Sequence, residues 1–138
     1  MRRLHFTLFL AVFCVFIGVA QDNESESGEK DIRPVITFEK NTHDFGKIEY
    51  NKGGTCNFIF RNTGEKPLII TAVWASCGCS TPLWPKAPIE SGKTDTVKVT
   101  YDTRIKGSFS KSIRVHSNAN NSPNYLRIKG EVLSQEKK

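Results

Sequence analysis

Residues 56–64 read Cys-Asn-Phe-Ile-Phe-Arg-Asn-Thr-Gly. The side chains of Cys56, Phe58 and Phe60 share one face of an extended strand, because successive residues of a strand point to opposite faces. The stretch 62–67, Asn-Thr-Gly-Glu-Lys-Pro, is rich in residues typical of a tight turn. A strand with one apolar face followed by a tight turn is typical of an antiparallel sheet that packs one face on a core.

The same alternation recurs as far as residue 133, and no helical apolar period of useful length interrupts it. Short runs rich in Val, Ile, Phe, Thr and Tyr are separated by clusters of Gly, Pro and Asn, which is typical of all-β folds. The side chains expected in the core are Cys56, Phe58, Phe60, Val97, Val99, Tyr101, Ile113, Val115, Leu126 and Ile128.

About seven short strands in about 100 residues predict an all-β fold, an immunoglobulin-like antiparallel β-sandwich. The run 67–75 is apolar almost throughout, so we expect it to lie centrally in a sheet or under a loop. The expected strands are 35–40, 46–50, 54–62, 67–75, 94–102, 108–117 and 124–133.

Length and composition are those of one globular domain, with 138 residues, 38% hydrophobic and 25% charged. The formal net charge of +6 is too modest for a chain that works by neutralising nucleic acid, so we expect no nucleic-acid partner. Four cysteines are too few for a disulfide scaffold.

The N-terminus predicts a signal peptide over residues 1–20. Arg2 and Arg3 precede the apolar run 8–19, and Ala20 ends a stretch of small residues suited to cleavage. The apolar core is about a dozen residues long, whereas a membrane-spanning helix needs about 20. We therefore expect a periplasmic or secreted protein with no transmembrane segment after cleavage.

The remaining chain divides into three parts. Residues 21–34 hold five acids and few large apolar side chains, so they predict a disordered acidic leader. Residues 35–134 carry the whole core and predict the domain, and residues 135–138 form a charged tail.

Two cysteines, Cys77 and Cys79, flank a glycine directly after the run 67–75. An i, i+2 pair lies inside or at the limit of disulfide geometry. We favour a structural bend. Thiol-redox exchange is one alternative, although the sequence lacks the Cys-x-x-Cys motif on a helix that such proteins usually use. Metal binding with His43 or His116 as a third ligand is another alternative, although no second cysteine pair completes the site.

Cys56 shares the apolar face of its strand, which predicts a small buried residue; a disulfide with one of the later cysteines is the alternative.

A proline- and tryptophan-rich segment follows the cysteines, and loops at the end of such sandwiches often carry binding surfaces. The candidate binding residues are Ser80, Thr81, Pro82, Trp84 and Pro85. The alternative is that Trp74 belongs to the core and that Trp84 pins the loop onto it.

Basic residues gather near one hairpin, and they either form a solvated face or attract an anionic glycan, lipopolysaccharide or a membrane surface. These residues are Arg104, Lys106, Lys111 and Arg114.

Catalysis is not expected. His43 and His116 are the histidines left after signal removal, and no nucleophile elbow, paired carboxylates or phosphate loop can be recognised. We therefore predict no cofactor and no resident metal.

Nine motifs, taken in order, resemble the bacterial exported family catalogued as domain of unknown function 1573, common in Bacteroidota. They lie at residues 43–48, 58–64, 67–70, 76–82, 88–93, 99–103, 107–111, 117–119 and 129–132. The resemblance covers residues 35–133, and its most specific part is Cys-Gly-Cys-Ser-Thr-Pro after the Asn-Thr-Gly hairpin; Cys56 lies outside it. A looser similarity to modules of ciliary and sperm-protein scaffolds rests on residues 58–70. The resemblance implies an immunoglobulin-like fold and an export route, and no reaction.

Together these features predict an exported, non-catalytic binding or assembly module of the cell envelope. Its expected partner is a protein or a cell-envelope glycan. The alternative is a thiol-redox or metal-binding protein that uses Cys77 and Cys79.

Overall fold

The computed structural model describes residues 30–134. The predicted signal peptide, residues 21–29 of the leader and the tail 135–138 lie outside the described residues. The compact unit begins at Asp31.

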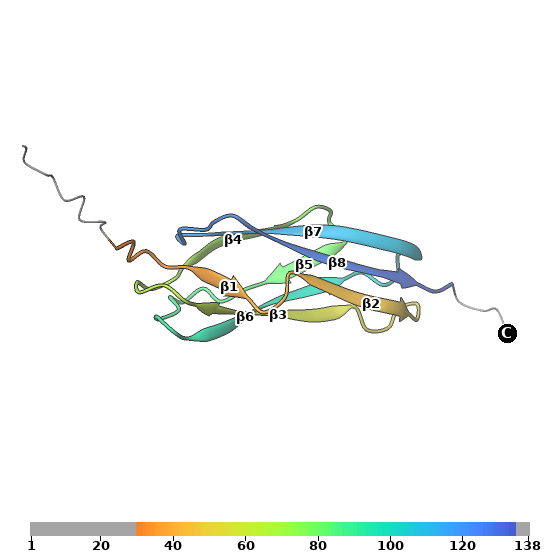
Figure 1. Cartoon of the computed structure of the whole chain (residues 1–138). Helices are drawn as coiled ribbons and strands as arrows, with labels where there is room; N and C mark the ends of the chain where they lie inside the picture. Colours follow the sequence, from red (N-terminus) through yellow and green to blue (C-terminus); the bar gives the residue numbers. More distant parts are fainter. Residues whose placement is uncertain (1–29, 135–138) are drawn as a thin grey trace, which may run out of the picture. The chain divides into compact units, whose positions relative to one another are not determined.

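Two four-stranded sheets face each other and confirm the immunoglobulin-like β-sandwich; β3 and β6 lie in one layer, and β4, β7 and β8 in the other (Figure 1). Sheet A has the strand order β1-β3-β6-β5 and sheet B the order β2-β8-β7-β4. The strands are β1 (Ile36–Phe38), β2 (Thr42–Ile48), β3 (Thr55–Asn62), β4 (Ile70–Ala75), β5 (Ser80–Leu83), β6 (Thr94–Tyr101), β7 (Gly107–Ser117) and β8 (Asn124–Val132).

Three features of the strand prediction were wrong. The eighth strand, β5, was not expected, and it exists because Ser80–Leu83 pairs with β6. Strand β2 covers 42–48 rather than 46–50, and it pairs in parallel with β8, so sheet B is mixed and not purely antiparallel. The run 67–75 gives an edge strand, β4, that begins only at Ile70.

The core lies between the two sheets. All ten side chains expected there are buried, and none is more than 5% exposed. The register explains this, because Phe58 lies opposite Val97 and Cys56 opposite Val99, so the apolar faces of β3 and β6 coincide. Ile113 and Leu126 are paired in the same way in sheet B.

The chain crosses between the sheets at both sides of the sandwich. Residues 39–41 join β1, at the edge of sheet A, to β2, at the edge of sheet B. Residues 76–79 join β4 to β5, which are the other two edge strands. Strands β7 and β8 are therefore central, and they are paired on both sides over residues 113–117 of β7 and 127–132 of β8.

Asn62 is a fully buried polar residue at the end of β3. Its Nδ2 donates to the carbonyl oxygens of Lys66 (2.8 Å) and Ile89 (2.9 Å), and its Oδ1 accepts from the Gly64 N–H (3.0 Å). A Cβ on Gly64 would overlap the backbone of Arg33 and Val35, so the N-terminal segment packs directly against this turn. The Asn-Thr-Gly stretch therefore has a structural role, in which it holds these segments against the end of β3.

Side-chain amides in the β7–β8 loop hold the segments that enter each sheet. The Asn121 amide pairs with both backbone groups of Ile36, at 3.1 and 2.8 Å. The Asn118 Oδ1 accepts from the Ile69 N–H at 2.8 Å. In the same loop, the backbone N–H of Asn120 donates to the Pro34 carbonyl, also at 2.8 Å. Residues 31–34 therefore contact the domain, although the sequence predicts that they belong to the leader.

We expect Asn62→Ala to lower the free energy of unfolding by about 2 to 4 kcal/mol, because it leaves the Lys66 carbonyl and the Gly64 N–H without partners and takes one of two donors from the Ile89 carbonyl. Urea unfolding followed by circular dichroism measures this. The matched control is Asn57→Ala, on the exposed face of the same strand, with an expected effect within about 0.5 kcal/mol. Equal effects of the two substitutions would contradict the role given to Asn62.

Candidate functional site

The cysteine turn lies at the crossing from β4 to β5. Cys77 and Cys79 form a disulfide, with their Cα atoms 5.2 Å apart. The Cys79 carbonyl accepts from the Asp102 N–H at 2.8 Å, and the Cys79 side chain packs against the core. The disulfide thus closes a bend between the edges of the two sheets.

Cys56 is a free, buried cysteine, so it does not bridge to the turn. Burial raises the pKa of its thiol to about 11, which keeps it protonated and poorly nucleophilic at neutral pH. In the described part of the chain, no three His, Cys, Asp or Glu side chains lie close enough to hold a metal ion.

The segment predicted as a binding loop is mostly a strand. Ser80, Thr81 and Pro82 belong to β5 and pair with β6, and Ser80 is 6% exposed. Trp84 is half-buried against the core, with Lys86 Nζ 3.2 Å from its ring centre, while Pro85 is half-buried beside it. The tryptophan therefore pins the segment that follows β5.

The four basic residues do not form one cluster. Arg104 pairs with Asp102 at 2.8 Å and holds the pKa of that carboxyl at about 2. Lys106 lies over the Tyr50 ring, and Lys111 is half-buried. Arg114 points to the outer face of sheet B.

Aromatic side chains and Arg114 form a row across that outer face. Trp74 on β4 is paired with Arg114 on β7, and Arg114 is paired with Tyr125 on β8. Trp74 is 50% exposed and Tyr125 is 62% exposed. The Arg114 guanidinium lies 5.2 Å from the Trp74 ring centre, and the His116 ring meets the same tryptophan edge-on at 4.8 Å.

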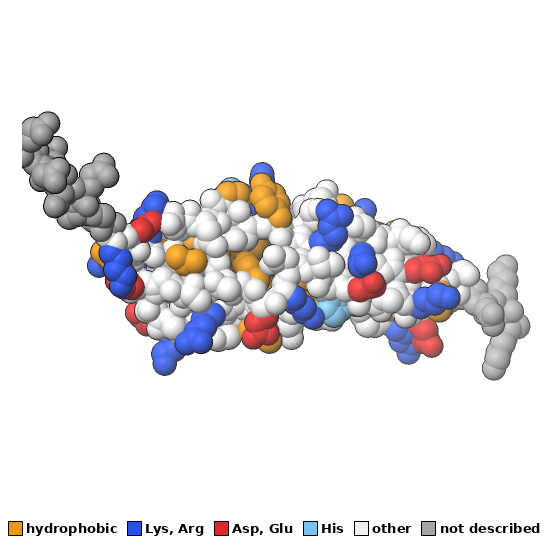
Figure 2. Space-filling model, in the orientation of Figure 1, with side chains coloured by type: hydrophobic (Ala, Val, Ile, Leu, Met, Phe, Trp, Pro, Cys, Tyr) orange, Lys and Arg blue, Asp and Glu red, His pale blue; other side chains and the backbone are white. Residues whose placement is uncertain are grey.

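The alternative in which Trp74 belongs to the core was wrong. A register shift between Ile70 and Ala72 turns Val73 inward, where it is 5% exposed, and turns Trp74 outward. In Figure 2, hydrophobic and basic side chains stand together along the upper margin, over sheet B.

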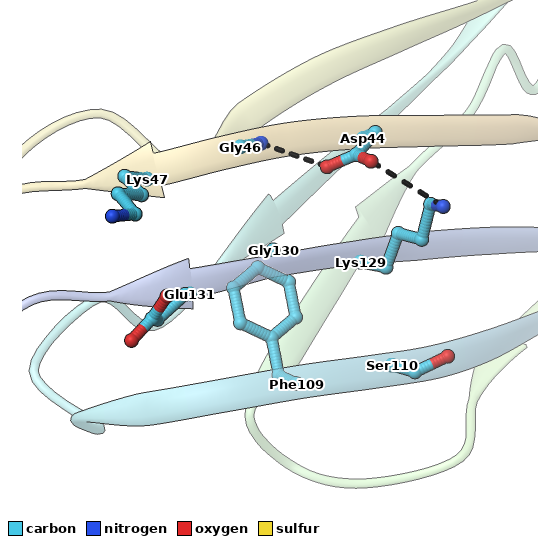
Figure 3. Close-up of a pocket in the computed structure, with 8 residues that line it drawn as sticks. All are labelled: Asp44, Gly46, Lys47, Phe109, Ser110, Lys129, Gly130 and Glu131. Carbon is cyan, nitrogen blue, oxygen red and sulfur yellow. Dashed lines mark hydrogen bonds and ion pairs between the residues drawn. The ribbon is translucent and has the colours of Figure 1, made fainter.

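An open pocket of about 400 Å³ lies further along the same face (Figure 3). Gly130 has no side chain, so the Phe109 ring lies beside it; a Cβ on Gly130 would be 3.0 Å from that ring. Lys129 Nζ is 3.3 Å from Asp44 Oδ2 at the rim, and Asp44 also accepts from the Gly46 N–H at 2.8 Å. The backbone hydrogen bond and then the lysine lower the pKa of Asp44.

Arg127 connects the row with the pocket, because its Nη1 donates to Ser110 Oγ at 3.3 Å and Ser110 lines the pocket. The arrangement presents exposed rings, hydroxyl groups and cations on rigid central strands, which suits binding of an anionic partner. Sequence reasoning missed Tyr125 and Arg127, and it considered His116 only as a metal ligand, because the row depends on the register between strands. The alternation of β8 places Tyr125 and Arg127 outside, but no local signal shows which neighbours they meet.

The family model described as "Protein of unknown function (DUF1573)" matches residues 36–132. The chain belongs to the DUF1573 family. This confirms the resemblance seen in the sequence motifs. No curated protein matches the chain.

Solved structures share the fold at low sequence identity. A protein of unknown function from Porphyromonas gingivalis W83 has a TM-score of 0.64 at 17% identity, over 71% of this chain and 46% of that one. The PapD-like domain 7 of human CEP192 has a TM-score of 0.60 at 12% identity, over 78% and 91%. The chain thus spans about half of the P. gingivalis protein and most of the human domain.

The YadV chaperone gives a TM-score of 0.54 at 14% identity, over 75% of this chain and 54% of the chaperone. The secreted serine protease VesC from Vibrio cholerae also contains the fold, and this chain covers 24% of it. At these identities the similarity shows the fold alone, so the function has to be argued from the surface.

We expect Cys77→Ser combined with Cys79→Ser to destabilise the domain by about 1 to 2 kcal/mol, because a disulfide that closes so short a loop removes little entropy from the unfolded chain. Thermal unfolding under non-reducing conditions measures the effect. The reduced wild-type protein is the control, because reduction opens the disulfide without changing a side chain. Loss of the folded domain in the double variant would show that the bend depends on the disulfide far more strongly than proposed.

Proposed function

We propose that the chain is an exported, non-catalytic binding or assembly module of the cell envelope, and that it binds through the outer face of sheet B. The observation that carries this proposal is the exposed row of Trp74, Arg114 and Tyr125. Tryptophan, tyrosine and arginine dominate the energetics of binding surfaces. Large exposed aromatic side chains gathered on a rigid face are typical of interaction sites.

Two observations support export. Residues 1–20 have the order of a signal peptide, with basic residues, an apolar run and small residues. The disulfide between Cys77 and Cys79 fits an oxidising compartment, where such bonds persist. In the described residues no helix is long and apolar enough to cross a membrane.

The charges of the surface support binding rather than catalysis. Asp31 and Asp102 each lie 2.8 Å from an arginine two residues further along, and Asp44 lies beside Lys129. These contacts stabilise the charged carboxylates and lower their pKa values. A general acid or base at neutral pH needs the opposite, a carboxyl pKa raised toward 7.

The binding proposal predicts that purified residues 21–138 sediment with a cell-envelope fraction of the native host. Trp74→Ala combined with Tyr125→Ala should reduce the bound fraction about tenfold, as expected for two central aromatic contacts. Ile59→Ala with Lys98→Gln, on the exposed face of sheet A, is the matched control and should bind like the wild type. Equal binding by both double variants would contradict the assigned surface.

Export and the redox alternative are tested separately. Mass spectrometry of the protein from its host should show a chain that begins at Gln21. The redox alternative predicts thiol–disulfide exchange with a reduced peptide in glutathione buffer. Exchange that is lost in the variant with Cys77→Ser and Cys79→Ser would show that the chain is a thiol-redox protein and would contradict the binding module.

A further inference from the structure

The outer face of sheet B carries a regular track of side chains along its two central strands. On β8 the outward residues are Tyr125, Arg127, Lys129 and Glu131. The first three form the track, and their partners on β7 are, in the same order, Arg114, Ser112 and Ser110. From Tyr125 to Lys129 the track is about 13 Å long, since a strand rises about 3.3 Å per residue.

The two ends of the track differ in chemistry. One end holds the aromatic rings of Trp74 and Tyr125, which are two strands and therefore about 10 Å apart. The other end is the pocket beside Gly130, with Lys129 and Ser110 at its rim (Figure 3). Arg127 stands between them and donates to Ser110.

Charge on the track favours an anionic ligand. Arg114, Arg127, Lys129 and Lys47 contribute four cations, and the acids near them are Asp44 and Glu131, both at the pocket end. Asp44 forms an ion pair with Lys129 and Glu131 lies opposite Lys47, so the two acids offset the two lysines at the pocket end. The aromatic end therefore presents Arg114 and Arg127 with no acid beside them on β4, β7 or β8.

The backbone of this face argues against an extended peptide. The N–H and C=O groups of β7 and β8 lie in the plane of the sheet and point toward neighbouring strands, so none of them points out of the face, although β7 is paired with β8 alone over residues 107–111. A peptide laid on the face would leave its own backbone groups without the partners that strand addition provides. A sugar chain needs none of these, because it has hydroxyls for Ser110 and Ser112 and apolar ring faces for Trp74 and Tyr125.

We propose that the outer face of sheet B binds an acidic polysaccharide, a chain of sugars that carries carboxylates, laid along β8 from the Trp74–Tyr125 pair toward the Lys129 pocket. Arg114 and Arg127 bind the carboxylates, since the guanidinium group forms paired hydrogen bonds with them. This inference rests on the proposed binding function and specifies its ligand.

The probe is a defined oligogalacturonate, titrated into residues 21–138 by isothermal calorimetry, with dextran as a neutral sugar. We expect saturable binding of the oligogalacturonate that weakens as NaCl is raised, and no binding of dextran. Arg114→Gln with Arg127→Gln, and separately Trp74→Ala with Tyr125→Ala, should each weaken binding about tenfold or more. Ile59→Ala with Lys98→Gln should change it less than about twofold.

Two further titrations distinguish other anionic partners. Poly-glutamate of matched charge and anionic phosphatidylglycerol vesicles should bind at least about tenfold more weakly, because they lack sugar rings for the two aromatic side chains. Equal binding of poly-glutamate, or unchanged binding by the aromatic double variant with its circular dichroism intact, would overturn the proposal. If oligogalacturonate does not bind but sedimentation with the envelope still depends on Trp74 and Tyr125, the proposed ligand is wrong and the proposed function still holds.

Discussion

The side-chain amide of Asn62, buried at the end of β3, holds the turn 62–67 to the segment that carries Ile89. These hydrogen bonds hold together the turn 62–67, the segment at Ile89 and the N-terminal segment, because Gly64 in the same turn packs against residues 33–35, which lead into β1. A buried amide can occupy such a place only when its donors and acceptor are all matched, as they are here. The positions of β1 and of the segment that carries Ile89 therefore both depend on Asn62.

Sheet B obtains its functional surface from the same architecture. The crossings at 39–41 and 76–79 place edge strands at both sides, and the disulfide closes the second crossing. Strands β7 and β8 are left in the centre, where pairing on both sides fixes the register of their outward side chains. Trp74, Arg114 and Tyr125 meet because of that register, without a loop to position them.

Local patterns predict the core well, because alternation along β3 and β6 follows directly from the two faces of a strand. They also predict the turn that contains Asn62 and the closeness of Cys77 and Cys79. They do not predict the outward position of Trp74, which depends on a register shift in β4, or the parallel pairing of β2. The composition of 80–83 indicates a loop, whereas pairing with β6 makes it a strand. The candidate site joins residues about 10 to 50 positions apart, so its existence depends on pairings that no local pattern contains.

The proposed ligand contacts one face of the sandwich, and the two tryptophans of the chain report on different parts of the surface. Trp74 is half exposed on the outer face of sheet B, and Trp84 is packed against the core with its Nε1 buried. The most direct measurement is a ¹H–¹⁵N correlation spectrum of residues 21–138, titrated with oligogalacturonate. We predict that the Trp74 indole signal and the amides of Arg114, Tyr125 and Arg127 shift, while the Trp84 indole signal stays in place. Shifts confined to Trp84, the cysteine turn or sheet A would contradict the assignment of the binding surface to sheet B.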